Sequence, residues 1–367
     1  MARRHTIAPP AWRRLSLPDA PRRERRGAGL AALVAVLLGA TLPAHAQPAA
    51  AGVPEARVVR TLTLKGDLGS GKERRSLSGI ACATPPGARE RACLLAGDEN
   101  DLLWSVTLTD SHIRLRHRIR LAAARGAAEL DLEAATFAAG ADGGAYYLTG
   151  SHGAARGSGA FEATRYQVFR IAADPATGLP RTGPGVVRTE ALAAIIAASP
   201  ELARVACRPH IACERLDRDG LTIEGLAARD GALYFGLRNP AAEQAILIRV
   251  PAASLFPGPA PQAQILRVHL GAGAGVRDLV PVAGGFLILA GSGRSDDHLP
   301  VRRSTIHFWD GQSATTTALA QITSPGEAKP EAMLLVAEST AGRPYQVLVL
   351  ADGIKDGAPT LYEVPAP

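Results

Sequence analysis

Short apolar runs, bounded by Gly, Pro and acidic residues, recur along most of the chain. Such runs are typical of buried strands. Five of them open with a similar acidic or small tetrapeptide, centred on Ser78, Glu133, Glu224, Asp278 and Glu331. These five positions are 55, 91, 54 and 53 residues apart. A fixed period in this range predicts a β-propeller.

Reading on from each opening gives the strands of one blade. Four copies continue through three further apolar or alternating segments, and the fifth ends one strand short. The alternating segment 57–64 is predicted to supply that missing outer strand and to close the ring. The long interval contains the alanine-rich residues 189–205, with Thr189 as a helix cap, which predict a helical insertion at about 189–219. The expected fold is therefore an all-β propeller of five four-stranded blades, with six blades as the alternative.

The amino terminus has the pattern of a secretory signal peptide. Residues 1–28 hold eight arginines, residues 29–42 form a short apolar run, and Ala44-His45-Ala46 gives the cleavage site. The run is shorter than the roughly 20 residues that span a bilayer. We expect removal of 1–46, a flexible segment 47–56 and a single domain 57–367 with no transmembrane segment, in the periplasm or secreted. Arg25-Arg26 leaves open whether the general secretory or the twin-arginine route is used.

Removing the leader changes the charge. The chain carries 41 basic and 34 acidic residues, net +7, and residues 1–46 hold 8 and 2 of these, which leaves net +1. Without a basic stripe, nucleic acid is not an expected partner; the alternating arginines of 114–120 fit a charged edge strand. Residues 66–72 have P-loop spacing, but Glu73 stands where Ser or Thr is needed, so no nucleotide cofactor is expected. The expected partner is a small molecule or a protein, and the chain is expected to be a monomer.

Four cysteines lie in the exported part: Cys82, Cys93, Cys207 and Cys213. An even number in an oxidising compartment predicts two disulfides. Cys82 and Cys93 lie on consecutive strands, which favours a cross-strand bridge, and Cys207 and Cys213 bracket a short loop. Their spacing does not suit a zinc site.

The blade topology predicts which side chains meet. Consecutive strands of a blade are antiparallel, so the start of the first and the end of the second share one face of the ring. The starts bring Glu133, Glu224, Asp278 and Glu331, with Asp131, Arg277 and Lys329 beside them. The ends bring Asp98, Glu99, Asn100, Ser151, His152, Arg238, Asn239, Arg294 and Asp352.

Three interpretations of the four carboxylates remain open. They accept backbone hydrogen bonds from neighbouring blades as a repeated architectural lock, they bind a hard cation such as calcium, or they act as acid and base in hydrolysis. Arg238 and Arg277 either clamp an anionic substrate or neutralise the carboxylates. We expect His152 to line the mouth of the channel.

The ordered motifs resemble a known family. Ser78-Gly79-Ile80, Gly97-Asp98-Glu99, Asp131-Leu132-Glu133, Ile223-Glu224-Gly225, Arg277-Asp278 and Lys329-Pro330-Glu331 are similar to the successive signatures of the bacterial domain of unknown function 3616 family, from residue 57 to the end. The resemblance implies a propeller and no particular activity. It extends loosely to exported phytase-like and lactonase-like propellers, which use calcium. Thr222, Ala134 and Ala332 depart from the expected pattern.

Two functions follow as hypotheses. The first is a calcium-assisted hydrolase of a small phosphoester, lactone or sugar. In it, Glu133, Glu224, Asp278 and Glu331 lie near the metal, Arg238, Asn239, Arg277 and His152 meet the substrate, and Glu133, Glu224 and His152 are the candidates for catalysis. The alternative is a non-catalytic periplasmic binding or protein-interaction module with a structural acidic ring.

Overall fold

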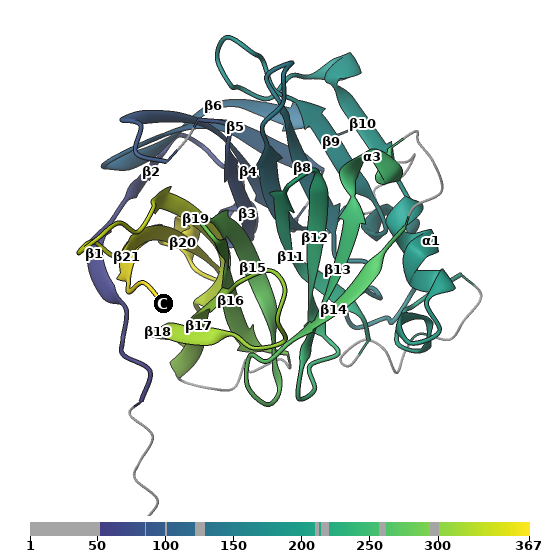
Figure 1. The fold of residues 1–367 in the computed structure, drawn as a ribbon. Coiled ribbons are helices and arrows are strands. Elements are labelled where there is room, and N and C mark those ends of the chain that lie inside the picture. Colours follow the sequence, from purple (N-terminus) through teal and green to yellow (C-terminus); the bar gives the residue numbers. More distant parts are fainter. Residues whose placement is uncertain are drawn as a thin grey trace, which may run out of the picture. The chain divides into compact units, whose positions relative to one another are not determined.

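The computed structural model describes residues 52–84, 86–99, 101–121, 129–209, 213, 220–256, 262–293 and 301–367. Five sheets stand around a central axis, which confirms the predicted five-bladed propeller (Figure 1). The predicted signal peptide and cleavage site lie outside the described residues. No helix in the described part is long and apolar enough to cross a membrane.

Each blade has four antiparallel strands, and blade 1 carries β2 as a fifth, parallel strand at its outer edge. The chain runs from the innermost strand outwards, but the last blade takes its outer strand from the amino terminus. Blade 1 comprises β3 (Leu77–Cys82), β4 (Glu90–Gly97), β5 (Leu102–Thr109) and β6 (His112–Arg120). Blade 2 comprises β7 (Leu132–Ala138), β8 (Ala145–Gly150), β9 (Val168–Ala172) and β10 (Val186–Thr189). Blade 3 comprises β11 (Thr222–Arg229), β12 (Ala232–Asn239), β13 (Ala245–Pro251) and β14 (Gln264–Val268). Blade 4 comprises β15 (Ala274–Val282), β16 (Gly285–Ser292), β17 (Val301–Trp309) and β18 (Thr317–Pro325). Blade 5 comprises β19 (Lys329–Ala337), β20 (Tyr345–Asp352), β21 (Thr360–Val364) and β1 (Arg57–Thr61).

The amino-terminal segment joins three blades at the outside of the ring. Glu55 forms a parallel bridge with Gln321 of β18, β1 pairs with β21, and β2 (Thr63–Lys65) pairs in parallel with β6. The predicted closing strand 57–64 therefore divides at Leu62, and its second half belongs to blade 1. Residues 54–56, predicted as flexible, hydrogen-bond to β18 instead.

The hydrophobic core lies between successive blades, because each sheet buries both of its faces against its neighbours. One apolar cluster joins blades 1 and 2, and equivalent clusters fill each following gap round to blades 5 and 1. Trp104, Phe169, Phe235 and Phe286 are among the largest side chains buried there. Burial on both faces explains why the strands read as continuous apolar runs rather than as strict alternation.

The long interval between Glu133 and Glu224 contains a helical insertion, as predicted. Helix α1 (Ala191–Ala198) buries Leu192, Ile195 and Ile196 against blades 2 and 3. The Thr189 hydroxyl accepts a hydrogen bond from the Ala191 amide at 3.1 Å, although Glu190 is the capping residue by position. A second short helix, α3 (Ala252–Leu255), follows β13, and single turns of 3-10 helix lie at Glu73–Arg75, Ala163–Arg165, Gly183–Gly185, Leu202–Arg204 and Lys355–Gly357. Both predicted disulfides are present, Cys82 to Cys93 and Cys207 to Cys213.

Candidate functional site

Every innermost strand carries one extra residue near its start. In each blade the register with the second strand skips one position, which marks a β-bulge. A bulge re-aims the side chain of the extra residue. The five skipped residues are Ser78, Glu133, Glu224, Arg277 and Glu331, and we call them the bulge ring. Blade 4 therefore presents Arg277 at the position that the repeat analysis gave to Asp278, a shift of one residue.

Arg277 is the centre of this ring electrostatically. Its Nη1 donates hydrogen bonds to Glu224 Oε2 of blade 3 at 2.9 Å and to Glu331 Oε1 of blade 5 at 3.0 Å. Its Nη2 donates to the Ser292 carbonyl at 2.9 Å. The residue is only 5% exposed. Arg277 therefore neutralises the carboxylates rather than clamping a substrate. Both of its terminal nitrogens are engaged.

Glu224 receives a second cation. Arg238 Nη1, at the end of β12, donates to Glu224 Oε1 at 2.7 Å. Burial alone would raise the pKa of Glu224, but the guanidinium groups of Arg238 and Arg277 outweigh it and hold that pKa below its usual value. Glu224 is therefore ionised although it is almost completely buried.

Asp278 forms the lock that the sequence suggested for all four acids. Its Oδ1 accepts from the Leu279 amide at 2.8 Å, and its Oδ2 accepts from the Met333 amide of blade 5 at 2.7 Å. In blade 1 the hydroxyl of Ser78 takes a comparable part by donating to the Leu132 carbonyl of blade 2. These side chains join neighbouring blades, so their oxygens are occupied by structure.

Glu133 differs from every other member of the ring. It is 8% exposed, and within the described residues no group donates a hydrogen bond to its carboxyl. Burial, followed by the charges of Asp131 and Glu224, raises the pKa of Glu133 well above its usual value. Burial without a donor favours the protonated form of this carboxyl, whereas the positive charge of Arg156 interacts with its ionised form.

A second ionic cluster supports the Glu133 strand from outside the ring. Arg165 forms ion pairs with Asp131, with Glu129 at 3.1 Å and with Glu162 at 3.1 Å. Burial raises the pKa of Glu129 to about 7, and a hydrogen bond with Glu99 adds to the effect. Asp131 itself has a positive φ of 50°, a conformation that non-glycine residues rarely adopt. Arg165 could not be predicted from the sequence, because its partners Asp131 and Glu129 lie 34 and 36 residues away and nothing in its local pattern marks it.

Asp98, after β4, extends the acidic face into blade 1. Its Oδ1 is buried and has no partner in the described part of the chain. Burial, then the charges of Asp352 and Asp131, raise its pKa to about 8. Across blade 5, Lys329 Nζ lies 3.7 Å from Asp352 Oδ2. Asn100 and Arg294, also predicted here, lie outside the described residues.

The prediction that His152 lines the mouth is wrong. The side chain is completely buried, with its ring centroid 5.6 Å from that of Tyr166. Its Nδ1 lies 3.0 Å from the Gly150 carbonyl, and burial lowers its pKa to about 4. A positive φ of 54° turns the chain at this point and directs the ring inward. Asn239, the other predicted substrate residue, is 7% exposed.

The four predicted calcium ligands do not converge as one set. Asp278 is occupied by backbone amides and Glu224 by two guanidinium groups, which leaves Glu133 and Glu331 with oxygens to offer. In the described part of the chain no group of three or more His, Cys, Asp or Glu residues has the arrangement of a metal site. Calcium binding therefore stays a prediction.

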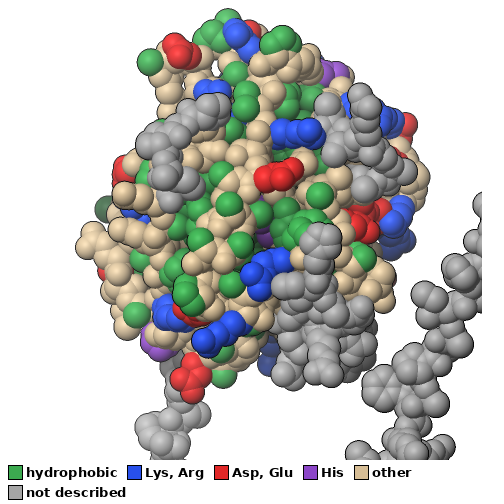
Figure 2. Space-filling model, turned by 90° about the vertical axis from the view of Figure 1, so that its right-hand side faces the viewer, with side chains coloured by type: hydrophobic (Ala, Val, Ile, Leu, Met, Phe, Trp, Pro, Cys, Tyr) green, Lys and Arg blue, Asp and Glu red, His purple; other side chains and the backbone are tan. Residues whose placement is uncertain are grey.

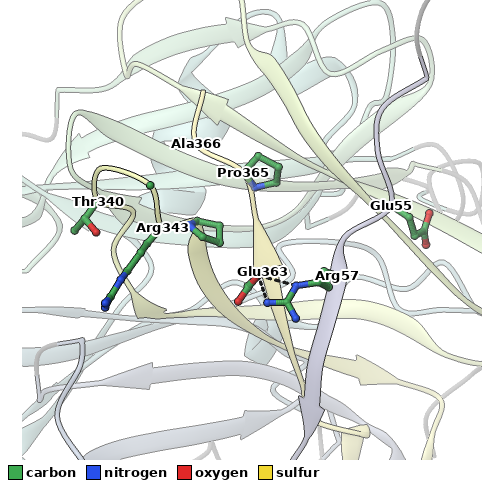
Figure 3. Close-up of a pocket in the computed structure, with 9 residues that line it drawn as sticks. Glu55, Arg57, Thr340, Arg343, Glu363, Pro365 and Ala366 are labelled. Carbon is green, nitrogen blue, oxygen red and sulfur yellow. Dashed lines mark hydrogen bonds and ion pairs between the residues drawn. The ribbon is translucent and has the colours of Figure 1, made fainter.

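A pocket of about 410 Å³ lies elsewhere, on the outside of blade 5 (Figure 3). Arg57 Nε donates to Glu363 Oε2 at 2.8 Å on one side of it, and the turn with Arg343 forms the other. That turn joins β19 to β20 at the end of the blade opposite to Glu331. The pocket thus shares no residue with the acidic face.

On the side of the molecule in Figure 2, Lys and Arg side chains lie between acidic and apolar ones. The described part of this surface shows no continuous basic stripe. Exposed ion pairs contribute little to stability. Buried charged groups are therefore the stronger candidates for a functional site.

No protein-family model and no curated protein matches the chain. Among solved structures, a GH43 β-1,3-galactosidase in complex with galactodeoxynojirimycin aligns at 10% identity and a TM-score of 0.42, over 79% of this chain and 90% of that one. The α-L-arabinanase of Penicillium chrysogenum aligns at 10% identity and 0.38, over 85% and 98%. A putative 6-phosphogluconolactonase from Bacteroides uniformis aligns at 11% and 0.32, over 78% and 71%. Similarity this low carries no argument about activity.

Replacing Arg277 by Met should destabilise the fold strongly. The change leaves Glu331 without a cation and Glu224 with only one, and losing one partner of a buried ion pair costs about 3–5 kcal/mol. Urea denaturation measures the loss, with Arg343→Met, an exposed arginine, as the matched control. A loss below about 1 kcal/mol for Arg277→Met would contradict the bridging role.

Asp98 should make stability depend on pH. Its carboxyl binds a proton more tightly in the folded protein, with pKa about 8, than at its usual value of 3.8. Its contribution to the free energy of unfolding is therefore largest in acid and is lost as the pH rises towards 8. Asp98→Asn should lose less stability than the wild type between pH 5 and pH 8 in urea denaturation. Equal losses in the two proteins would show that Asp98 titrates normally.

Proposed function

We propose that this protein is an exported propeller hydrolase that cleaves a small sugar, lactone or phosphoester at the acidic face, with Glu133 as general acid. The observation that carries the proposal is the contrast between two neighbouring buried carboxyls. Glu133 has no donor and a raised pKa, whereas Glu224 is kept ionised by two arginines. Carboxyl groups whose environments drive their pKa values apart are the usual pair in acid-base hydrolysis.

The two carboxyls divide the chemistry. Glu133 donates its proton to the leaving-group oxygen as the bond to that oxygen breaks. Water forms the new bond to the electrophilic carbon or phosphorus, and its released proton restores Glu133. With a sugar substrate, Glu224 stays ionised, held in place by Arg238 and Arg277, and stabilises the positive charge that develops on the sugar in the transition state. The low exposure of these residues strengthens every such interaction.

Glu133→Gln should abolish hydrolysis without unfolding the protein. Glutamine preserves the shape and cannot donate a proton of comparable acidity, so a loss of about 10²–10⁴-fold in kcat is expected. A panel of chromogenic glycosides, lactones and phosphomonoesters provides the assay, with thermal unfolding to establish the fold. Glu338→Gln, at the opposite end of blade 5, is the control carboxyl and should keep full activity. Equal turnover by Glu133→Gln and wild type would refute the assignment.

The second candidate is a binding or protein-interaction module, favoured by the locks at Asp278 and Ser78 and by the Arg277 bridge. Those contacts account for most of the acidic face without any chemistry. Under this function, the wild type turns over no member of the panel. Glu133→Gln then gains stability, because a buried carboxyl without a donor is replaced by a neutral amide.

A calcium ion held by Glu133 and Glu331 is the competing arrangement, because it would require Glu133 to be ionised rather than to donate a proton, and the ion would then supply Lewis acidity. A bound ion stabilises the folded state by mass action. Thermal unfolding with calcium and with a chelator, together with elemental analysis, tests it. The calcium hypothesis predicts a lower melting temperature in the chelator. It fails if the two melting temperatures agree and no metal is found.

Three further properties are proposed: the location of the protein, its oligomeric state and its family. Two disulfides suit an oxidising compartment, so we place the protein in the periplasm or outside the cell. We propose a monomer whose partner is a small molecule. Membership of the domain of unknown function 3616 family is proposed on the residue motifs alone.

A further inference from the structure

Asp131 has a backbone conformation that its surroundings must hold in place. Its φ of 50° lies in the left-handed region, and the residue directly precedes β7, two positions before Glu133. The Asp131 carbonyl accepts a hydrogen bond from the Ser151 amide at 3.0 Å, just after β8. A strained residue beside a candidate site is grounds for a functional hypothesis, because the contacts around it must fix it.

These contacts come mainly from Arg165, whose three guanidinium nitrogens are all engaged. Its Nη1 donates to Asp131 Oδ2, its Nη2 to Glu129 Oε2 at 3.1 Å and its Nε to Glu162 Oε2 at 3.1 Å. The Arg165 carbonyl accepts a hydrogen bond from the His152 amide at 3.1 Å. The residue is only 7% exposed. Arg165 therefore ties the segment before β7 to the segment after β8.

Arg165 acts on the proposed general acid only through Asp131. In the described part of the chain, no hydrogen bond or ion pair joins Arg165 to Glu133. Burial raises the pKa of Asp131, and the charge of Arg165, followed by a hydrogen bond from the Ser151 hydroxyl, opposes that rise. Because a guanidinium group stays protonated, Arg165 is a permanent counter-charge for a carboxylate in this position. Without it, the buried carboxyl of Asp131 is expected to take up a proton.

Several other charges also face Glu133. Asp131, Glu224, Glu331 and Asp98 favour its protonated form, and Arg156 favours its ionised form. Among these charges, that of Asp131 has the largest effect on the pKa of Glu133 after burial. Glu224 and Glu331 are matched by Arg277 in the bulge ring. The charge of Asp131 is thus the main one that depends on Arg165.

We propose that Arg165 is a positioning residue for Glu133, which holds Asp131 ionised and in place so that Glu133 keeps its proton. The inference rests on the proposed hydrolase for the role of that proton. A general acid is effective only while it is protonated. Arg165 would therefore set the upper limit of the pH range in which the enzyme works, without touching the substrate.

The protonation of Glu133 tests this link without any turnover. It is followed by infrared spectroscopy as the absorption that Glu133→Gln removes, in an Asp98→Asn background, while the pH is raised. We expect the midpoint of this titration to fall by about one pH unit in Arg165→Gln and in Asp131→Asn, because each removes the neighbouring negative charge. Arg165→Lys should restore a midpoint close to that of wild type, since it keeps a positive charge beside Asp131.

Two features of the design separate this effect from a loss of stability. Asparagine adopts positive φ values readily, so Asp131→Asn should fold even if Arg165→Gln does not. Arg229→Gln is the control, because it removes hydrogen bonds to the Val282 and Gly285 carbonyls at the opposite end of the ring and should leave the midpoint unchanged. An unchanged or higher midpoint in Asp131→Asn, or in folded Arg165→Gln, would overturn the proposal.

Turnover provides the second measurement. With an active substrate, kcat/KM should decline on the alkaline side as Glu133 ionises, and this decline should move to lower pH in Arg165→Gln by the same amount as the infrared midpoint. A midpoint that falls in a protein without hydrolase activity would refute the hydrolase and leave the link between Arg165 and Glu133. Turnover with an unmoved midpoint and an unmoved pH profile would refute the link and leave the hydrolase.

Discussion

The hydrogen bonds from one guanidinium nitrogen of Arg277 to Glu224 and Glu331 hold three consecutive blades at their innermost point. Three charges buried so close to the axis would be strongly unfavourable singly. The guanidinium group of Arg277 lies between the two acids and fixes the spacing of blades 3, 4 and 5, and Arg238 adds a second positive charge at Glu224. Asp278, the next residue, extends the same junction through the Met333 amide. One dipeptide of blade 4 thus organises this half of the ring.

In the other half of the ring, formed by blades 1 and 2, the bulge ring offers no cation to balance its carboxyl. Blade 1 contributes the hydroxyl of Ser78, which is bound to the Leu132 carbonyl, so Glu133 of blade 2 meets no cation in the bulge ring. A fully symmetric propeller would offer five equivalent positions. Here the sequence Ser, Glu, Glu, Arg, Glu leaves Glu133, whose pKa is raised, beside Glu224, whose pKa is lowered. The proposed acid-base chemistry rests on that broken symmetry.

Much of the fold could be predicted from the sequence alone, because the blade repeat is visible there as a nearly constant spacing. The spacing of the openings gave five blades, the alanine-rich run gave α1, and the cysteines gave both disulfides. The residue at which each strand bulges could not be predicted. The repeat pattern pointed to Asp278, but the bulged residue is Arg277, and a shift of one residue places a strand side chain on the other face. His152 failed for a related reason, since its positive φ turns the ring into the core. The partners of Arg165 depend on contacts that no local pattern encodes.

The protonation of Glu133 is the central claim, and infrared difference spectroscopy near pH 7 measures it most directly. A protonated carboxyl gives a carbonyl stretch that is distinct from the bands of a carboxylate. Other buried carboxyls, Asp98 among them, also have raised pKa values and contribute to this absorption. We predict that in an Asp98→Asn background Glu133→Gln decreases the absorption of protonated carboxyls, and that Glu224→Gln leaves it unchanged. A band lost in Glu224→Gln, or a spectrum unchanged in Glu133→Gln, would contradict the account.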